Sequence, residues 1–97
     1  MKKYFLASLC RNGILGGGIA ADTESITYHT GKLTISEKYR HLEMKYKDIR
    51  FLRPGRFLLF PTVTLAMENG EEYKFLIFAK NQFVNMLKQM GVREQIP

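Results

Sequence analysis

The chain has 97 residues, 45% of them hydrophobic, and its 15 Lys and Arg against 9 Asp and Glu give a formal net charge of +6. This length suits one small domain, residues 1–97, because seven Phe and five Tyr can fill one hydrophobic core but hardly two. The only cysteine, Cys10, excludes an internal disulfide, and no apolar run reaches the roughly 18 residues of a membrane span.

The positive charge is concentrated in the middle of the chain. Residues 38–56 carry seven Lys or Arg and two acidic residues, a net charge of +5. Residues 1–37 carry four positive and three negative residues, and residues 57–97 carry four of each. The basic character of the protein therefore belongs to residues 38–56.

The start of the chain imitates a secretion signal, with Lys2 and Lys3 before an apolar run, Tyr4 to Leu9, that ends at Cys10. That run is shorter than the roughly 7–15 apolar residues of a signal, and Leu9 is larger than the small residue that a cleavage site needs. We therefore expect a cytoplasmic, soluble protein.

Residues 1–13 fit two kinds of local structure. Phe5, Ala7 and Leu9 alternate as in a strand, whereas the apolar residues also fit one face of a helix that would stop at Asn12-Gly13. Both alternatives stay open at this point.

The next stretch predicts a β-hairpin, with strands at Gly17–Ala21 and Ile26–Thr30 and a polar turn at Asp22–Ser25. Three consecutive glycines, Gly16 to Gly18, resemble part of a phosphate-binding loop. Such a loop requires a following helix with Lys and Ser or Thr at set spacing, and that helix is missing here. We expect the glycines to let the backbone bend or approach a neighbour closely.

Residues 42–47 alternate between apolar and charged side chains, which is typical of a strand with one face on the core and one face in water. The residues expected to face the core are Leu42, Met44 and Tyr46. The residues expected to face water are Glu43, Lys45 and Lys47.

After this strand the alternation continues through Ile49 and Phe51 with a shift of one residue at Asp48, which indicates a bend or bulge. Pro54-Gly55 then predicts a reversal of the chain, because Pro presets the first turn position and Gly accepts a positive φ at the second.

Residues 57–78, FLLFPTVTLAMENGEEYKFLIF, predict the clearest hairpin in the chain. Asn69-Gly70 supplies the two positive-φ residues of a tight turn. Pro61 cannot donate a ladder hydrogen bond, so its end of the strand is expected at an edge or a bulge. The alternating apolar positions are Val63, Leu65 and Met67 before the turn and Tyr73, Phe75 and Ile77 after it.

The last segment changes to a helical period. Asn81 is the expected N-cap of this helix and Gly91 its expected stop. Strands followed by one amphipathic helix predict an α+β, mainly β, domain in which the helix covers an open end or face of the sheet. The apolar face of the helix is formed by Phe83, Val84, Leu87 and Met90.

The order of these elements resembles the pleckstrin-homology-like (PH-like) superfamily, in particular domains of the GRAM and bacterial PH type. The resemblance is carried by LEMKYKDIRFL, where Tyr46 to Ile49 follow a strand, by the return strand EEYKFLIF and by the closing helix. It covers a core of about residues 16–91.

This resemblance implies a bent, partly open antiparallel β-barrel of about seven strands, capped by a C-terminal helix. It places Tyr46 and Ile49 in the core and turn, and it assigns Asp48 to fixing the bend. Members of the superfamily bind lipid headgroups, peptides or protein surfaces and are seldom enzymes. Their inositol phosphate site commonly uses basic residues at the first hairpin turn, whereas the turn ADTES here contains Asp22 and Glu24.

An enzyme or metal site needs groups that converge, and the chain offers few. His29 and His41 fall in different strands, Cys10 is distant from both, and no metal-ligand spacing links them. Three glutamates flank a hairpin turn, where charged residues are usually solvated; they are Glu68, Glu71 and Glu72. We expect no catalytic site, no cofactor and no bound metal.

The basic segment is the candidate binding site. Its field would attract acidic ligands, and each cation close to an anionic membrane contributes about 1 kcal/mol of binding. The expected partner is a protein or an anionic lipid surface. The alternative is that the cations only keep an edge strand from pairing with other chains. The candidate residues are Lys45, Lys47, Arg50, Arg53 and Arg56.

The sequence also allows two other partners, single-stranded nucleic acid and a second copy of the chain. A small basic β-barrel can bind single-stranded nucleic acid through stacking aromatics, and Tyr39, Phe57 and Phe60 lie near the cations in sequence, although most aromatics alternate inward. The run RFLLF, residues 56–60, is apolar on both faces and could make an edge contact that forms a homo-oligomer, or it could be buried under the helix.

Overall fold

The computed structural model of the chain describes residues 2–11, 13–31 and 40–95. These residues form seven strands, one short 3-10 turn and one C-terminal α-helix. The elements are β1 (Lys3–Cys10), β2 (Ile14–Ala21), β3 (Ser25–His29), β4 (His41–Lys45), η1 (Tyr46–Asp48), β5 (Ile49–Phe57), β6 (Phe60–Met67), β7 (Glu72–Ile77) and α2 (Lys80–Gln89).

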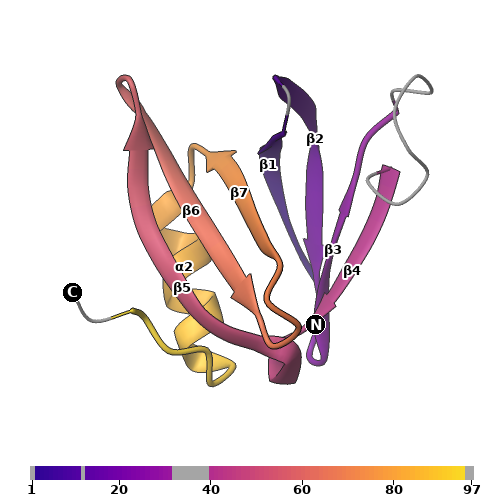
Figure 1. Cartoon of the computed structure of the whole chain (residues 1–97). Helices are drawn as coiled ribbons and strands as arrows, with labels where there is room; N and C mark the ends of the chain where they lie inside the picture. Colours follow the sequence, from indigo (N-terminus) through magenta and orange to yellow (C-terminus); the bar gives the residue numbers. More distant parts are fainter. Residues whose placement is uncertain (1, 12, 32–39, 96–97) are drawn as a thin grey trace.

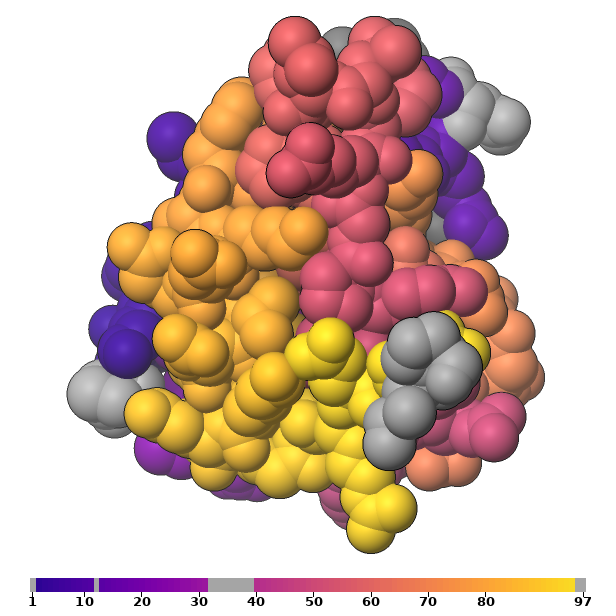
Figure 2. All heavy atoms as spheres, turned by 90° about the vertical axis from the view of Figure 1, so that its left-hand side faces the viewer, coloured from indigo at the N-terminus to yellow at the C-terminus, as the bar shows by residue number. Residues whose placement is uncertain are grey.

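The strands form one antiparallel sheet in the order β4-β3-β2-β1-β7-β6-β5. Figure 1 shows the sheet bent into two halves, β1 to β4 and β5 to β7, that lean apart toward one end. The mainly β half-barrel with a C-terminal helix that the sequence predicts is therefore confirmed. Figure 2 shows the helix and the C-terminal segment covering one side of the molecule.

The N-terminal segment is a strand, which resolves the two alternatives that its sequence left open. Phe5, Ala7 and Leu9 are buried, as the strand alternation predicts. β1 pairs with β2 along its whole length and with β7 from Ala7 opposite Ile77 onward. Although it precedes the stretch that resembles the PH-like core, β1 is the central strand that joins the two halves of the sheet.

The predicted hairpin of residues 17–30 is confirmed as β2 and β3. The carboxylate of Asp22 accepts hydrogen bonds from the backbone N–H groups of Glu24 and Ser25, at 2.8 and 2.9 Å, which stabilises the turn. Because β1 is a strand, this turn is the second hairpin turn of the sheet. The sequence analysis compared this turn with the first hairpin turn of PH-like domains, and that comparison was wrong because the first hairpin turn joins β1 and β2.

The predicted inward and outward faces of residues 42–47 are confirmed. Leu42, Met44 and Tyr46 are buried, and the charged side chains between and after them are exposed. The bend expected at Asp48 takes the form of η1, which leads from β4 into β5. The register shift comes slightly later, between Ile49 and Phe51, so that Leu52 rather than Phe51 fills the core.

The reversal predicted at Pro54-Gly55 is wrong. Both residues lie inside β5, opposite Val63 and Thr62, and the chain reverses only at residues 58–59. The physical reason is that β5 is an edge strand, where a proline without an N–H group is tolerated.

The hairpin of β6 and β7 is confirmed, but its turn differs in detail from the prediction. Gly70 has φ +91°, whereas Asn69 is not among the described residues with positive φ. The Gly70 N–H donates to the Met67 carbonyl at 3.0 Å, and the Asn69 Oδ1 accepts from the Glu71 N–H at 2.9 Å. A single left-handed glycine therefore completes this turn.

The helix begins one residue before the predicted N-cap. Ala79 is the N-cap of α2 and makes no side-chain capping bond, so the role expected for Asn81 was wrong. Gly91, with φ +91°, ends the helix as predicted. The helix packs on the core through Phe83, whose ring meets the Phe5 ring edge-on at a centroid distance of 5.1 Å.

The glycine run of β2 allows close approach of backbones at one position. A Cβ atom on Gly17 would lie 2.2 Å from the backbone carbonyl oxygen of His29, whereas a Cβ on Gly16 would meet no atom within 4 Å. A backbone atom cannot move aside as a flexible side chain can. The expectation of a close backbone contact is therefore confirmed at Gly17.

We predict that Gly17→Ala lowers the free energy of unfolding by about 1–3 kcal/mol, because overpacking must displace β3. The matched variant Gly16→Ala should change it by less than about 0.5 kcal/mol. Urea denaturation followed by circular dichroism measures both values. Equal losses in the two variants would contradict the packing argument.

Candidate functional site

The connection from β4 to β5 gathers cations around a hollow of about 600 Å³. Lys45 comes from the end of β4, Lys47 from η1 and Arg50 from the start of β5, and all three are exposed. The segment after the helix adds Arg93 to the same hollow. We name these four residues, Lys45, Lys47, Arg50 and Arg93, the basic corner.

Tyr46 anchors the basic corner to the rest of the molecule. Its side chain is buried, and its hydroxyl donates to the backbone carbonyl of Asp22 at 2.7 Å and lies 3.4 Å from the Met86 Sδ atom. The Tyr46 N–H also donates to the Glu24 carbonyl at 3.1 Å. One residue thus ties the corner to the β2–β3 turn and to helix α2.

The surroundings of Tyr46 affect its ionisation. Burial raises the pKa of the Tyr46 phenol, and the nearby Asp22 carboxylate raises it further because a phenolate would be repelled. The pKa of Asp22 is lowered in turn, mainly because the backbone N–H groups of Glu24 and Ser25 stabilise its charged form. Tyr46 is therefore neutral, and Asp22 charged, throughout the physiological range.

A second link fixes the corner from the other side. The N–H of Glu68, in the β6–β7 turn, donates to the backbone carbonyl of Asp48 at 2.8 Å. The resemblance assigned Asp48 to fixing the bend, and this backbone contact joins the bend to the neighbouring hairpin. The corner is consequently held by hydrogen bonds to two separate turns and by contact with a helix.

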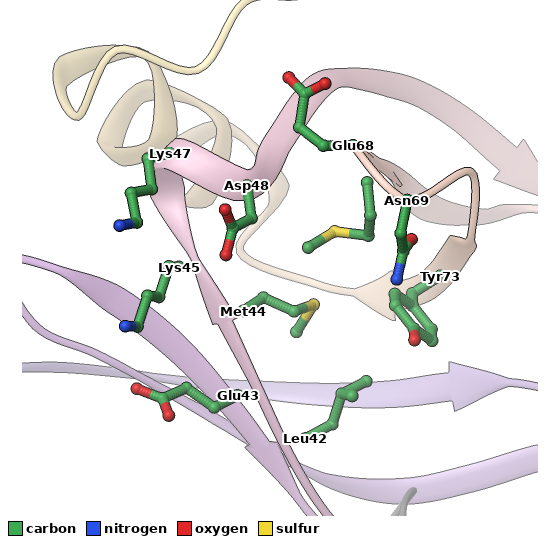
Figure 3. Close-up of a pocket in the computed structure, with 10 residues that line it drawn as sticks. Leu42, Glu43, Met44, Lys45, Lys47, Asp48, Glu68, Asn69 and Tyr73 are labelled. Carbon is green, nitrogen blue, oxygen red and sulfur yellow. The ribbon is translucent and has the colours of Figure 1, made fainter.

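A neighbouring hollow of about 490 Å³ lies between β4 and the β6–β7 turn. Figure 3 shows Leu42 and Met44 pointing toward Tyr73, whereas Lys45 and Lys47 extend to the opposite side of the strand. Leu42, Met44 and Tyr73 line this hollow and are buried, and exposed charged residues of both signs line it as well. Lys45, Lys47 and Glu68 line both hollows, so the two form a continuous surface around η1.

The structure divides the five predicted binding residues into two groups. Lys45, Lys47 and Arg50 belong to the basic corner, whereas Arg53 and Arg56 line a separate surface with Lys74 along β5. The Arg53 Nη2 donates to the Glu72 Oε1 at 2.9 Å, so part of its charge is already balanced. The extended strand through Pro54-Gly55 carries these two arginines away from the corner.

Arg93 was missed by sequence reasoning. It follows Gly91 beyond the helix, in a stretch without periodicity. Its backbone carbonyl accepts a hydrogen bond from the Leu52 N–H at 2.7 Å, and the Gln95 N–H donates back to Leu52 at 2.8 Å. Only this long-range pairing with β5 brings Arg93 to the corner, and no local pattern encodes it.

The structure brings together two of the residues considered for catalysis. His29 and His41 are direct partners across β3 and β4, and both are exposed. Within residues 2–11, 13–31 and 40–95, no group of three or more His, Cys, Asp or Glu side chains could hold a metal ion. Glu71 accepts a hydrogen bond from the Tyr73 hydroxyl, and Glu72 pairs with Arg53.

In the same described ranges, no helix has the length and apolar character that crossing a membrane requires.

No model of a protein family matches the chain, and a search of curated proteins finds no significant relative.

Among solved structures, the chain is similar to the C-terminal domain of an unknown protein from Leishmania infantum. The match has a TM-score of 0.75 at 9% sequence identity and covers 91% of this chain and 80% of that domain. At this identity the likeness shows a shared fold and nothing about function.

We predict that Tyr46→Phe lowers the free energy of unfolding at neutral pH by about 1–2 kcal/mol, because the partly buried hydrogen bond from the Tyr46 hydroxyl to the Asp22 carbonyl is lost. Because the pKa of Tyr46 is raised in the folded protein, its contribution to the free energy of unfolding is fully present below the ordinary tyrosine pKa of about 10. That contribution is lost as the pH rises through the pKa of the folded state.

The variant should therefore lose less stability than the wild type between neutral pH and alkaline pH. Urea titrations across that range measure the difference, and residual dependence is expected because burial also raises the pKa of Tyr28. Identical alkaline profiles for the two proteins would contradict the role given to Tyr46.

Proposed function

We propose that this chain is a non-catalytic binding module of the PH-like, GRAM type that docks an acidic segment of a partner protein in the cytoplasm. The basic corner is the binding site. The observation that carries the proposal is the convergence of Lys45, Lys47, Arg50 and Arg93 around one hollow on an anchored strand connection. The order of strands and the closing helix support the PH-like assignment.

Electrostatics support an acidic ligand. Among the described residues, Lys45, Lys47 and Arg50 form no ion pair with an acidic side chain, so their charges face solvent. An anchored corner also loses little conformational entropy on binding, because Tyr46 already holds the backbone in place. Cations that are positioned but unpaired are suited to recognise carboxylates.

The shape of the site favours a protein segment over a flat membrane. Glu24 and Glu68 line the same hollow as the cations, and a flat anionic surface would bring them against lipid headgroups. A flexible acidic segment can instead place its carboxylates on the cations alone. Leu42, Met44 and Tyr73 line the neighbouring hollow and can contact an apolar side chain of the same segment.

The test is binding of a fluorescent poly-glutamate peptide, followed by anisotropy over a salt series. Two triple variants with the same change in net charge are compared. The corner variant combines Lys45→Gln, Lys47→Gln and Arg50→Gln. The control variant combines Arg53→Gln, Arg56→Gln and Lys74→Gln. We predict that the first set raises the Kd at least about tenfold and that the second changes it about twofold or less, because exposed charges beyond about 10 Å are screened.

Equal weakening in both sets would show that only the net charge attracts the peptide, and the basic corner would then not be a site. An oligonucleotide of thymidine serves as the competing probe. If this probe binds more tightly than the peptide and its binding requires Phe57, the nucleic-acid alternative is favoured. Phe57 and Phe60 lie at the tip of the β5–β6 hairpin, and Tyr39 lies outside the described residues.

A further inference from the structure

The hairpin of β5 and β6 ends in exposed apolar side chains. Leu58 is 78% exposed and Leu59 is 90% exposed, although leucine ordinarily contributes to a core. Figure 2 shows this hairpin as a knob at the top of the molecule, beyond the helix. We name its exposed residues, Phe57, Leu58, Leu59 and Phe60, together with Phe78, the apolar tip.

The backbone of this turn has a positive φ at Leu58, a conformation that suits glycine better than leucine. Phe57 pairs with Phe60, so Leu58 and Leu59 form a two-residue turn, and Leu58 has φ +56°. Glycine is the usual residue at the first position of a turn with this φ, because a side chain there is strained. Leu58 therefore carries backbone strain and contributes little to the core, which indicates a role outside folding.

The apolar surface continues from the turn across the sheet. The Phe60 ring contacts the Phe78 ring edge-on, with centroids 6.0 Å apart. Strand β1 pairs Ala7 with Ile77, which brings Leu6 beside the end of β7, and Leu6 is also exposed. These side chains extend the apolar tip well beyond an isolated surface leucine.

Cations surround the apolar tip, and acidic residues are missing from its sequence. Arg56 is exposed beside it, the Lys74 Nζ lies 5.7 Å from the centre of the Phe57 ring, and the Lys80 Nζ donates to the Gly55 carbonyl at 3.0 Å. No Asp or Glu occurs in residues 53–64 or 73–83. An apolar tip within a ring of cations is complementary to an anionic lipid surface.

We propose that the apolar tip inserts into the interface of an anionic membrane, with Arg56, Lys74 and Lys80 at the level of the headgroups. A second copy of the chain is a poorer occupant, because two tips in contact would bring these cations together on two molecules of net charge +6. The tip lies at the opposite end of the sheet from η1 (Figure 1), so insertion would leave the basic corner in the aqueous phase.

The absence of tryptophan from the chain allows a direct test. Leu59→Trp places one fluorophore in the tip, and Lys47→Trp places a matched one at the basic corner. Each variant is titrated with vesicles of phosphatidylcholine alone and with vesicles that also contain phosphatidylserine. We expect a blue shift and quenching by brominated lipid for Leu59→Trp on the anionic vesicles, and unchanged emission for Lys47→Trp.

Cosedimentation with the same vesicles tests the strain argument. The double variant Leu58→Gly with Leu59→Ser should unfold at a urea concentration equal to or above the wild type, because glycine relieves the positive φ. Its partition onto anionic vesicles should fall at least about tenfold, since two apolar side chains are lost from the interface. Peptide binding at the basic corner should not change, which separates this proposal from the proposed function.

Any of the following vesicle results would overturn the proposal: a folded double variant that binds vesicles as well as the wild type, a blue shift at Lys47→Trp instead of Leu59→Trp, or no sedimentation of the wild type at low salt. A concentration-dependent blue shift of Leu59→Trp without vesicles would also overturn it and would assign the tip to self-association.

Discussion

The arrangement of the candidate site depends on the contacts that the hydroxyl of Tyr46 makes. The chain crosses from one half of the sheet to the other at η1, and the Tyr46 hydroxyl joins that crossing to the carbonyl of Asp22 and the sulfur of Met86. The Tyr46 side chain is buried, its contact with the Met86 sulfur is buried and its bond to the Asp22 carbonyl is partly buried, so losing these contacts carries a cost in stability. Lys45 and Lys47 flank Tyr46 in sequence, so the anchored tyrosine fixes where the two cations are displayed.

The two surfaces that we consider functional differ in chemistry and lie at opposite ends of the bent sheet (Figure 1). The basic corner is concave and mixed with two acidic side chains, which suits a flexible acidic segment. The apolar tip is exposed, and Arg56, Lys74 and Lys80 lie beside it, which suits an anionic bilayer. A domain of this kind could hold an acidic segment at one end while the other end rests in a membrane interface.

Local sequence patterns predicted most elements because each depends on neighbouring residues. The alternation at Leu42, Met44 and Tyr46 and the stop at Gly91 were read correctly for this reason. Pro54-Gly55 misled because its turn signal was overridden by the edge position of β5, a property of the whole sheet. Likewise, Arg93 reaches the corner, and Arg53 leaves it, only through long-range strand pairing that no single sequence encodes locally.

The most direct measurement of the central claim is a map of backbone amide chemical shifts in a nitrogen-15 labelled sample titrated with poly-glutamate peptide. The account predicts that the largest saturable changes occur at residues 45–50 and at Arg93, with little change along residues 53–57. Changes spread evenly over all surface cations, or centred on the β5–β6 hairpin, would contradict a binding site at the basic corner.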